Sequence, residues 1–197
     1  THYYSYTNLD TKGYVGKDLV KGKLWHDRQW TKYGFSKGIW AWNWFSVQTS
    51  DNMEIVCVDC GGKKFADILY ADGRQETCRA DFRPLGKTWK SPVTGLKYEL
   101  EWEIKVKNFL IKTKPFMKKC EVNFGRINYW EGPLQIRVNG KKAKGFMELL
   151  LKGQPTMVKS LLKQGELEIL KQIKKYRYGH YAGPKAVFVA FRRLAGV

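Results

Sequence analysis

A carboxylic acid stands among aromatic residues in the stretch L-W-H-D-R-Q-W, residues 24–30. In a β-strand Trp25 and Asp27 point to the same side, because side chains two positions apart share a face. Burial beside indoles disfavours an ionised carboxyl group, and indole faces stabilise positive charge. An acid beside such a wall could protonate an alkene and shelter the carbocation. The alternative reading, that Asp27 caps a turn or pairs with Arg28, stays open.

The next aromatic stretch, W-A-W-N-W-F-S-V-Q, occupies residues 40–48. At a period of two, its tryptophans share one face with two hydrogen-bonding side chains, and Asn43 belongs to the other face with Phe45. The stretch is either a dense core or the wall of a pocket for a flat, apolar ligand. The candidate ligand-binding residues here are Trp25, Trp42, Asn43, Trp44, Ser46 and Gln48.

Two further carboxylates lie within apolar or aromatic strands. Glu131 belongs to Y-W-E-G, and Glu148 belongs to G-F-M-E-L. A buried carboxylate needs a partner, such as an arginine, the Tyr129 hydroxyl or Asn43. Tyr129, Glu131 and Glu148 are therefore candidates for the ligand site, and the alternative is a buried ion pair that fixes the fold.

The sequence offers little for other chemistries. It contains no serine–histidine–aspartate order and no glycine-rich phosphate loop. Cys57 and Cys60 fall on opposite faces of a predicted strand, which favours free thiols over a metal site. We predict no cofactor. Free thiols are typical of a reducing compartment, so we expect a cytoplasmic protein.

Short strands separated by turns account for most of residues 1–152. Leu100, Trp102, Ile104 and Val106 alternate with charged residues, which predicts one strand over 98–106 with one buried face. Asn139-Gly140 predicts a hairpin turn, and residues 51–52, 61–62 and 72–73 mark further turns. No helical period interrupts these strands, which favours an antiparallel barrel or sandwich. Trp25 precedes the tryptophan stretch closely enough to lie on a neighbouring strand.

The hydrophobic period changes after Pro155. Met157, Leu161 and Leu162 begin a helical spacing with lysines between the apolar positions. We therefore divide the chain into a β-barrel domain, 1–152, and a basic, amphipathic helical appendage, 153–197. Such a helix packs against its own barrel or lies on an anionic membrane surface.

Composition limits the possible partners. The 197 residues are 43% hydrophobic and 27% charged, as in a folded domain, and the longest uncharged run has 13 residues, against about 20 for a membrane-spanning helix. The net charge of +18 favours anionic partners or a solubilising coat. Nucleic acid is not expected, because the basic residues are spread along the chain and strand alternation buries the tryptophans.

Several motifs, in this order, resemble the lipocalin-like AttH and carotenoid 1,2-hydratase (hydroxyneurosporene synthase) family. The match covers about residues 3–150 and resembles the C-terminal barrel of that family. The motifs are L-W-H-D-R-Q-W, W-N-W-F-S-V-Q, W-K-S-P-V-T-G-L-K-Y, Y-W-E-G and G-F-M-E-L.

The resemblance implies a calycin-type β-barrel with an interior cavity. It further implies an apolar polyene or isoprenoid ligand and, in some members, acid-catalysed hydration or cyclisation. Asp27 matches the aspartate that acts as the acid, and Trp25 matches the tryptophan of the same segment. The alternative function is a non-catalytic carrier of apolar ligands at an anionic membrane surface.

Two departures from the family pattern bear on activity. Arg28 stands where the family has a histidine, so an Asp–His relay is missing and Arg28 could hold Asp27 ionised. Family members usually carry two such barrels, whereas this chain has room for one. If both are needed, the protein is a binding module or works as a homo-oligomer.

Overall fold

The computed structural model describes residues 2–30, 41–124 and 127–152, which form strands and turns without a helix. This confirms a mainly β fold. The predicted appendage, 153–197, lies outside the described residues, and the described part contains no helix able to span a membrane. The strands are β1 (His2–Val15), β2 (Asp18–Trp30), β3 (Trp42–Thr49), β4 (Glu54–Cys60), β5 (Lys63–Leu69), β6 (Gln75–Pro84), β7 (Thr88–Lys90), β8 (Lys97–Glu99), β9 (Trp102–Val106), β10 (Phe109–Pro115), β11 (Glu121–Phe124), β12 (Ile127–Val138) and β13 (Lys141–Leu150).

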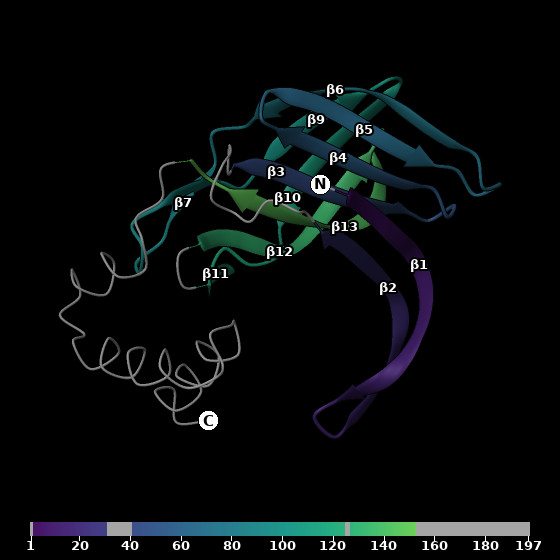
Figure 1. Ribbon diagram of the computed structural model, residues 1–197, viewed down its shortest axis with the longest axis horizontal. Helices are drawn as coiled ribbons and strands as arrows, with labels where there is room; N and C mark the ends of the chain where they lie inside the picture. Colours follow the sequence, from purple (N-terminus) through teal and green to yellow (C-terminus); the bar gives the residue numbers. More distant parts are fainter. Residues whose placement is uncertain (1, 31–40, 125–126, 153–197) are drawn as a thin grey trace.

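Eight strands close into an antiparallel barrel (Figure 1). Their order is β10-β9-β6-β5-β4-β3-β13-β12, and pairing of β10 with β12 closes the ring. β11 pairs with the first residues of β12, and β7 and β8 form a separate small sheet. Closure pairs the backbone groups of every barrel strand on both sides, which removes exposed sheet edges.

Apolar side chains from all eight strands fill the barrel interior. On β3, Phe45 and Val47 point inward and are fully buried, so Trp42, Trp44, Ser46 and Gln48 point outward. The expectation that the tryptophan face forms the core and lines an interior cavity was therefore wrong. The principal core residues are Phe45, Val47, Ile55, Cys57, Ala66, Ile68, Ala80, Ile104, Val106, Ile111, Leu134, Ile136, Met147 and Leu149.

The predicted turns are confirmed, and one predicted strand is interrupted. Asn139 and Gly140 take the positive φ angles of 48° and 82° that a tight hairpin requires, and β13 begins directly after them at Lys141. The single strand predicted over 98–106 is divided into β8 and β9. The reason is that the backbone at Leu100 and Glu101 bonds to the 85–87 loop instead of continuing a ladder.

The first two strands form a long hairpin that extends from the barrel (Figure 1). Its own ladder pairs Ser5 with Asp27, with a register shift between Tyr6 and Leu9. The expectation that the Trp25 strand neighbours the tryptophan strand in the sheet was wrong, because β3 pairs with β4 and β13. The hairpin instead meets the barrel through side chains.

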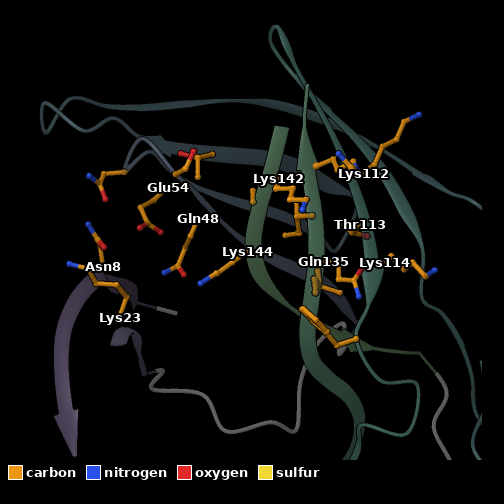
Figure 2. Close-up of a pocket in the computed structure, with 18 of the residues that line it drawn as sticks. Asn8, Lys23, Gln48, Glu54, Lys112, Thr113, Lys114, Gln135, Lys142 and Lys144 are labelled. Carbon is orange, nitrogen blue, oxygen red and sulfur yellow. The ribbon is translucent and has the colours of Figure 1, made fainter. Parts of the chain in front are cut away.

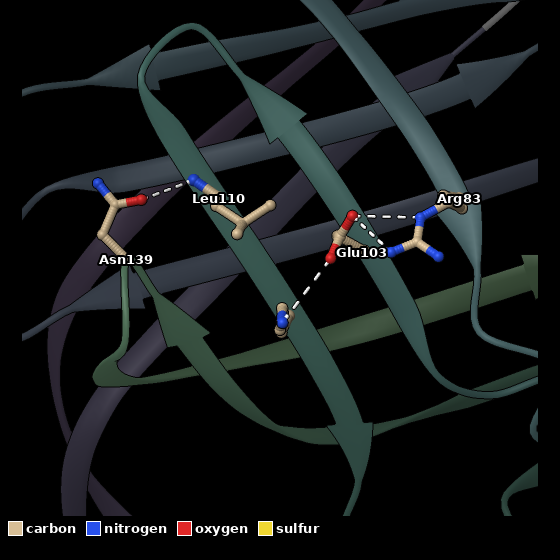
Figure 3. Close-up of polar contacts among 5 residues, drawn as sticks. Arg83, Glu103, Leu110 and Asn139 are labelled. Carbon is tan, nitrogen blue, oxygen red and sulfur yellow. Dashed lines mark hydrogen bonds and ion pairs between the residues drawn. The ribbon is translucent and has the colours of Figure 1, made fainter.

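Polar contacts join the strands around the closure of the barrel (Figure 3). The Asn139 side chain accepts a hydrogen bond from the Leu110 amide at 2.7 Å, which ties the β12–β13 turn to β10. Arg83 donates two hydrogen bonds to Glu103, at 2.7 and 3.2 Å, between β6 and β9. These contacts fix the register of the closing strands.

The W-K-S-P-V-T-G-L-K-Y motif has a structural role, because its hydroxyl groups hold one carboxylate. Ser91, Thr94 and Tyr98 donate to Glu121 at 2.5, 2.6 and 2.8 Å. Tyr98 is fully buried, and its pKa is raised by burial and by the Glu121 carboxylate. The cluster fastens the 91–98 loop to β11.

We predict that Tyr98→Phe lowers the free energy of unfolding by about 1.5–3 kcal/mol, the usual contribution of a hydrogen bond to a charged group. Urea unfolding followed by far-UV circular dichroism measures this change. Tyr14→Phe is the matched control, since Tyr14 is 74% exposed. Equal stability of the two variants would contradict the assigned role of Glu121.

Candidate functional site

The outer face of β12, β13 and β3 gathers the acidic and aromatic residues that the sequence singled out. Glu131 lies directly opposite Glu148, and Glu148 lies directly opposite Trp44. The Trp42 indole donates a hydrogen bond to Glu148 Oε2 at 3.2 Å. Two carboxyl groups on adjacent strands therefore lie beside two indoles, outside the barrel.

The hairpin docks on this face through Trp44. The Trp44 indole nitrogen donates to the Tyr3 hydroxyl at 3.0 Å, and the Trp25 ring meets the Trp44 ring edge to face, with centroids 5.8 Å apart. Trp44 is only 8% exposed as a result. The predicted association of Trp25 with the tryptophan stretch is thus present, although it forms between two sheets.

Asp27 occupies the same face of the hairpin as Trp25. Its Oδ1 accepts hydrogen bonds from the Trp25 indole at 2.6 Å and from the Ser5 hydroxyl at 2.5 Å. Asp27 lies within β2, so it caps no turn, and no ion pair among the described residues includes it. Arg28 points to the other face of the hairpin, where its guanidinium lies 5.7 Å from the Trp30 ring centroid.

The carboxyl groups of the site differ in their electrostatic surroundings. Burial raises the pKa of Glu148 to about 7, and the negative charges of Glu131 and Asp27 add to this rise against the opposing Trp42 hydrogen bond. Burial and then the hydrogen bond with Glu131 raise the pKa of Tyr129. Glu148 thus holds a proton over much of the range up to neutrality, and the Asp27 carboxyl on the hairpin is close enough to influence its pKa.

Three residues that the sequence assigned to the site have other surroundings. Asn43 is on the inward face of β3 with Phe45, and it borders a separate 250 Å³ pocket. Ser46 is 3% exposed, and its hydroxyl accepts a hydrogen bond from the Phe146 amide. Gln48 lies further along β3, where it hydrogen-bonds the Glu54 carboxyl.

The sequence analysis did not identify two residues of the site, Tyr3 and Ser5. Their alternation in Y-Y-S-Y is a strand signal, but only the hairpin register brings Ser5 opposite Asp27. Burial raises the pKa of Tyr3, whose hydroxyl joins Ser5 and Trp44. No short-range pattern links these residues to an acid 22 positions away.

A groove of about 1010 Å³ continues along the outside of the barrel from Gln48 (Figure 2). One wall is the hairpin, with Asn8 and Lys23, and the other comprises the outer faces of β10, β12 and β13. The groove therefore follows the same hairpin and barrel surfaces that meet at Trp44.

We predict that Glu148 makes the protein less stable as the pH rises from 4.5 to about 7. Below pH 4.5 the carboxyl is protonated in the folded and unfolded states alike, whereas at higher pH the unfolded state ionises first. The loss is at most about 3.4 kcal/mol, from a pKa difference of about 2.5 at 1.36 kcal/mol for each unit.

Urea unfolding of wild type and Glu148→Gln across this pH range measures the effect, and the variant should show a smaller fall. Glu131→Gln is the control for the cause: it keeps the carboxyl of Glu148 but removes the like charge opposite it, so the Glu148 pKa should decrease. Identical pH dependence of wild type and Glu148→Gln would refute the protonated Glu148.

Comparison with known proteins shows which family and which solved structures this chain resembles. The AttH-like family model matches residues 1–153. A kievitone hydratase of Fusarium solani subsp. phaseoli is 24% identical over an alignment of 123 residues that covers 55% of this chain and 35% of that protein.

Two solved structures share the fold. The crystal structure of an AttH protein from Nitrosomonas europaea superposes with a TM-score of 0.66 and 24% identity, over 75% of this chain and 51% of that one. Kievitone hydratase from Nectria haematococca superposes with a TM-score of 0.60 and 19% identity, over 76% of this chain and 53% of that one.

The chain thus spans about half the length of these structures and a smaller share of the curated hydratase. Its barrel is hydratase-like in fold, and the resemblance seen in the sequence motifs is confirmed. The protein belongs to the AttH-like family.

Proposed function

We propose that the protein adds water to a double bond of an apolar, polyene or isoprenoid-type molecule where the hairpin meets the barrel. The observation that carries the proposal is that Asp27 from the hairpin and Glu148 from the barrel flank the same group of tryptophans. Similarity to a protein named as a hydratase supports this reaction class.

The aromatic side chains suit a reaction that passes through a cation. Trp25, Trp42 and Trp44 offer indole faces, which attract positive charge most strongly where water is excluded. Trp42 and Trp25 also donate hydrogen bonds to the two carboxyl groups, so each acid is held against an aromatic ring. A cation formed between them would be stabilised by rings and carboxylate together.

In this mechanism one carboxyl group, Glu148, donates a proton and the other, Asp27, accepts one. Glu148, protonated near neutral pH, gives its proton to one alkene carbon, and the adjacent carbon becomes the carbocation. A water molecule attacks that carbon and passes its extra proton to Asp27. Asp27 then releases this proton to solvent and Glu148 takes one up, so the net reaction consumes alkene and water and yields an alcohol. Capture of the cation by an internal double bond would give a cyclised product instead.

The hypothesis from the sequence gave the donor role to Asp27, and that assignment stays a prediction. The two assignments differ in pH dependence. If Glu148 is the donor, turnover falls above pH 7, where this group loses its proton.

We predict that Asp27→Asn and Glu148→Gln each reduce turnover by about 10²–10⁴-fold, the usual contribution of a general acid or base. Turnover is measured on a panel of isoprenoid and polyene alkenes in heavy-oxygen water, by mass spectrometry of the alcohol. Asp81→Asn is the matched control, because Asp81 is an exposed carboxylate on β6, outside the site.

Full activity of Asp27→Asn would remove Asp27 from the mechanism. A bound alkene at one per chain with no product, in wild type, would favour the alternative function of a non-catalytic carrier. A wild-type pH profile without a decline above pH 7 would rule out Glu148 as the proton donor.

A further inference from the structure

The strand register gathers cations on the outer face of the barrel, on β10, β12 and β13. Lys112, Arg137 and Lys142 lie directly opposite one another on these three strands. Two residues along, Lys114, Gln135 and Lys144 form a second such row. We call these six residues the basic patch; all six are exposed at the surface and line the groove.

The patch works against the stability of the barrel. Adjacent strands are about 4.8 Å apart and like charges directly opposite each other repel, so five cations within about 10 Å are unfavourable without a counter-charge. Within the described part of the chain, the only ion pair of the patch joins Lys112 to Glu103 at 3.8 Å. Most of its charge is therefore available to an anion.

The groove gives the patch a concave setting. Figure 2 shows Lys142 and Lys144 on one side and Asn8 and Lys23 of the hairpin on the other. Six of the side chains lining the groove are cationic, and two, Glu54 and Glu101, are acidic. Such a cleft encloses a small ligand and focuses positive potential on it.

Glu54 adds an unpaired polar atom to the same groove. It is 4% exposed, and its Oε2 has no hydrogen-bond partner among the described residues. Burial raises its pKa to about 7 against the opposing effects of Gln48 and Lys23, so near neutrality much of it is uncharged and able to donate a hydrogen bond. The row Lys144–Gln48–Glu54 joins the patch to the tryptophan strand.

We propose that the basic groove binds the phosphate or diphosphate group of an amphipathic ligand whose apolar chain lies along the tryptophan face. This rests on the proposed function and narrows its substrate class to alkenes that carry a phosphate-type group at one end. Gln48 follows Trp44 by four residues, so the anionic group and the reacting double bond are separated by about 13 Å of strand.

The charge and shape of the groove favour a phosphate or diphosphate group over other anions. Five cations exceed what a single carboxylate neutralises, whereas phosphates take several charge-assisted hydrogen bonds. Single-stranded nucleic acid is bound through aromatic platforms, yet Phe116 is the only aromatic residue among those lining the groove that the structure describes. The walled shape also fits a soluble small molecule better than a flat bilayer.

The test is isothermal titration calorimetry of the full chain with inorganic pyrophosphate. We expect Lys114→Gln/Lys142→Gln/Lys144→Gln to weaken binding at least about tenfold, since three charge-assisted contacts are lost. Lys63→Gln/Lys90→Gln/Lys97→Gln removes equal charge from exposed positions elsewhere and should change affinity less than about twofold. Equal losses in both triple variants, or no binding by wild type, would overturn the proposal.

A second set of ligands identifies the source of the phosphate. A prenyl diphosphate should bind more tightly than pyrophosphate and than the matching prenyl alcohol, with the difference from the alcohol lost in the groove triple variant. Binding confined to vesicles of phosphatidic acid, to RNA or to a fatty acid would overturn the proposal. Asp27→Asn should keep pyrophosphate binding, so a failed hydratase assay and a failed phosphate site are distinguishable.

Discussion

The site depends on the contact between one indole, that of Trp44, and the hairpin. The Trp44 ring nitrogen bonds Tyr3, and its ring meets Trp25 edge to face. Among the described strands, no backbone ladder joins the hairpin to the barrel, so these side-chain contacts decide where Asp27 lies. An aromatic pair contributes about 0.5–1.5 kcal/mol beyond its buried area, and a buried hydrogen bond adds a similar amount. That energy orders a separate two-stranded sheet, and the docked hairpin brings Asp27 near Glu148.

Strand alternation predicted which residues share a face, but not which face is the interior. Trp42, Trp44, Ser46 and Gln48 do point the same way, and Phe45 and Val47 do point the other way. Both faces of β3 are apolar at their centre, so hydrophobicity alone does not separate them. Size does not separate them either, since Trp102 and Trp130 lie in the core, whereas Trp44 points outward and is covered by Tyr3 and Trp25 of the hairpin.

Long-range register accounts for the features that the sequence could not supply. The basic residues are mostly spread along the sequence, which argued against nucleic-acid binding, yet Lys112, Arg137 and Lys142 meet because β10, β12 and β13 are neighbours. Ser5 reaches Asp27 in the same way, through a hairpin whose register includes an irregularity. By contrast, the Asn139-Gly140 turn was predictable because its signal is local.

The outer face of the barrel contains pairs of like charges that repel each other, which a purely structural surface would avoid. Glu131 opposite Glu148 places two acids where like charges repel, and the cations of β10, β12 and β13 repeat the arrangement with the opposite sign. The core is independent of both, since it is built from the inward face of the same strands. Neutral residues at these positions would keep the barrel and relieve the repulsion. Because natural proteins hold such local conflicts mainly where function requires them, the acidic pair and the basic patch are best understood as two parts of one ligand site.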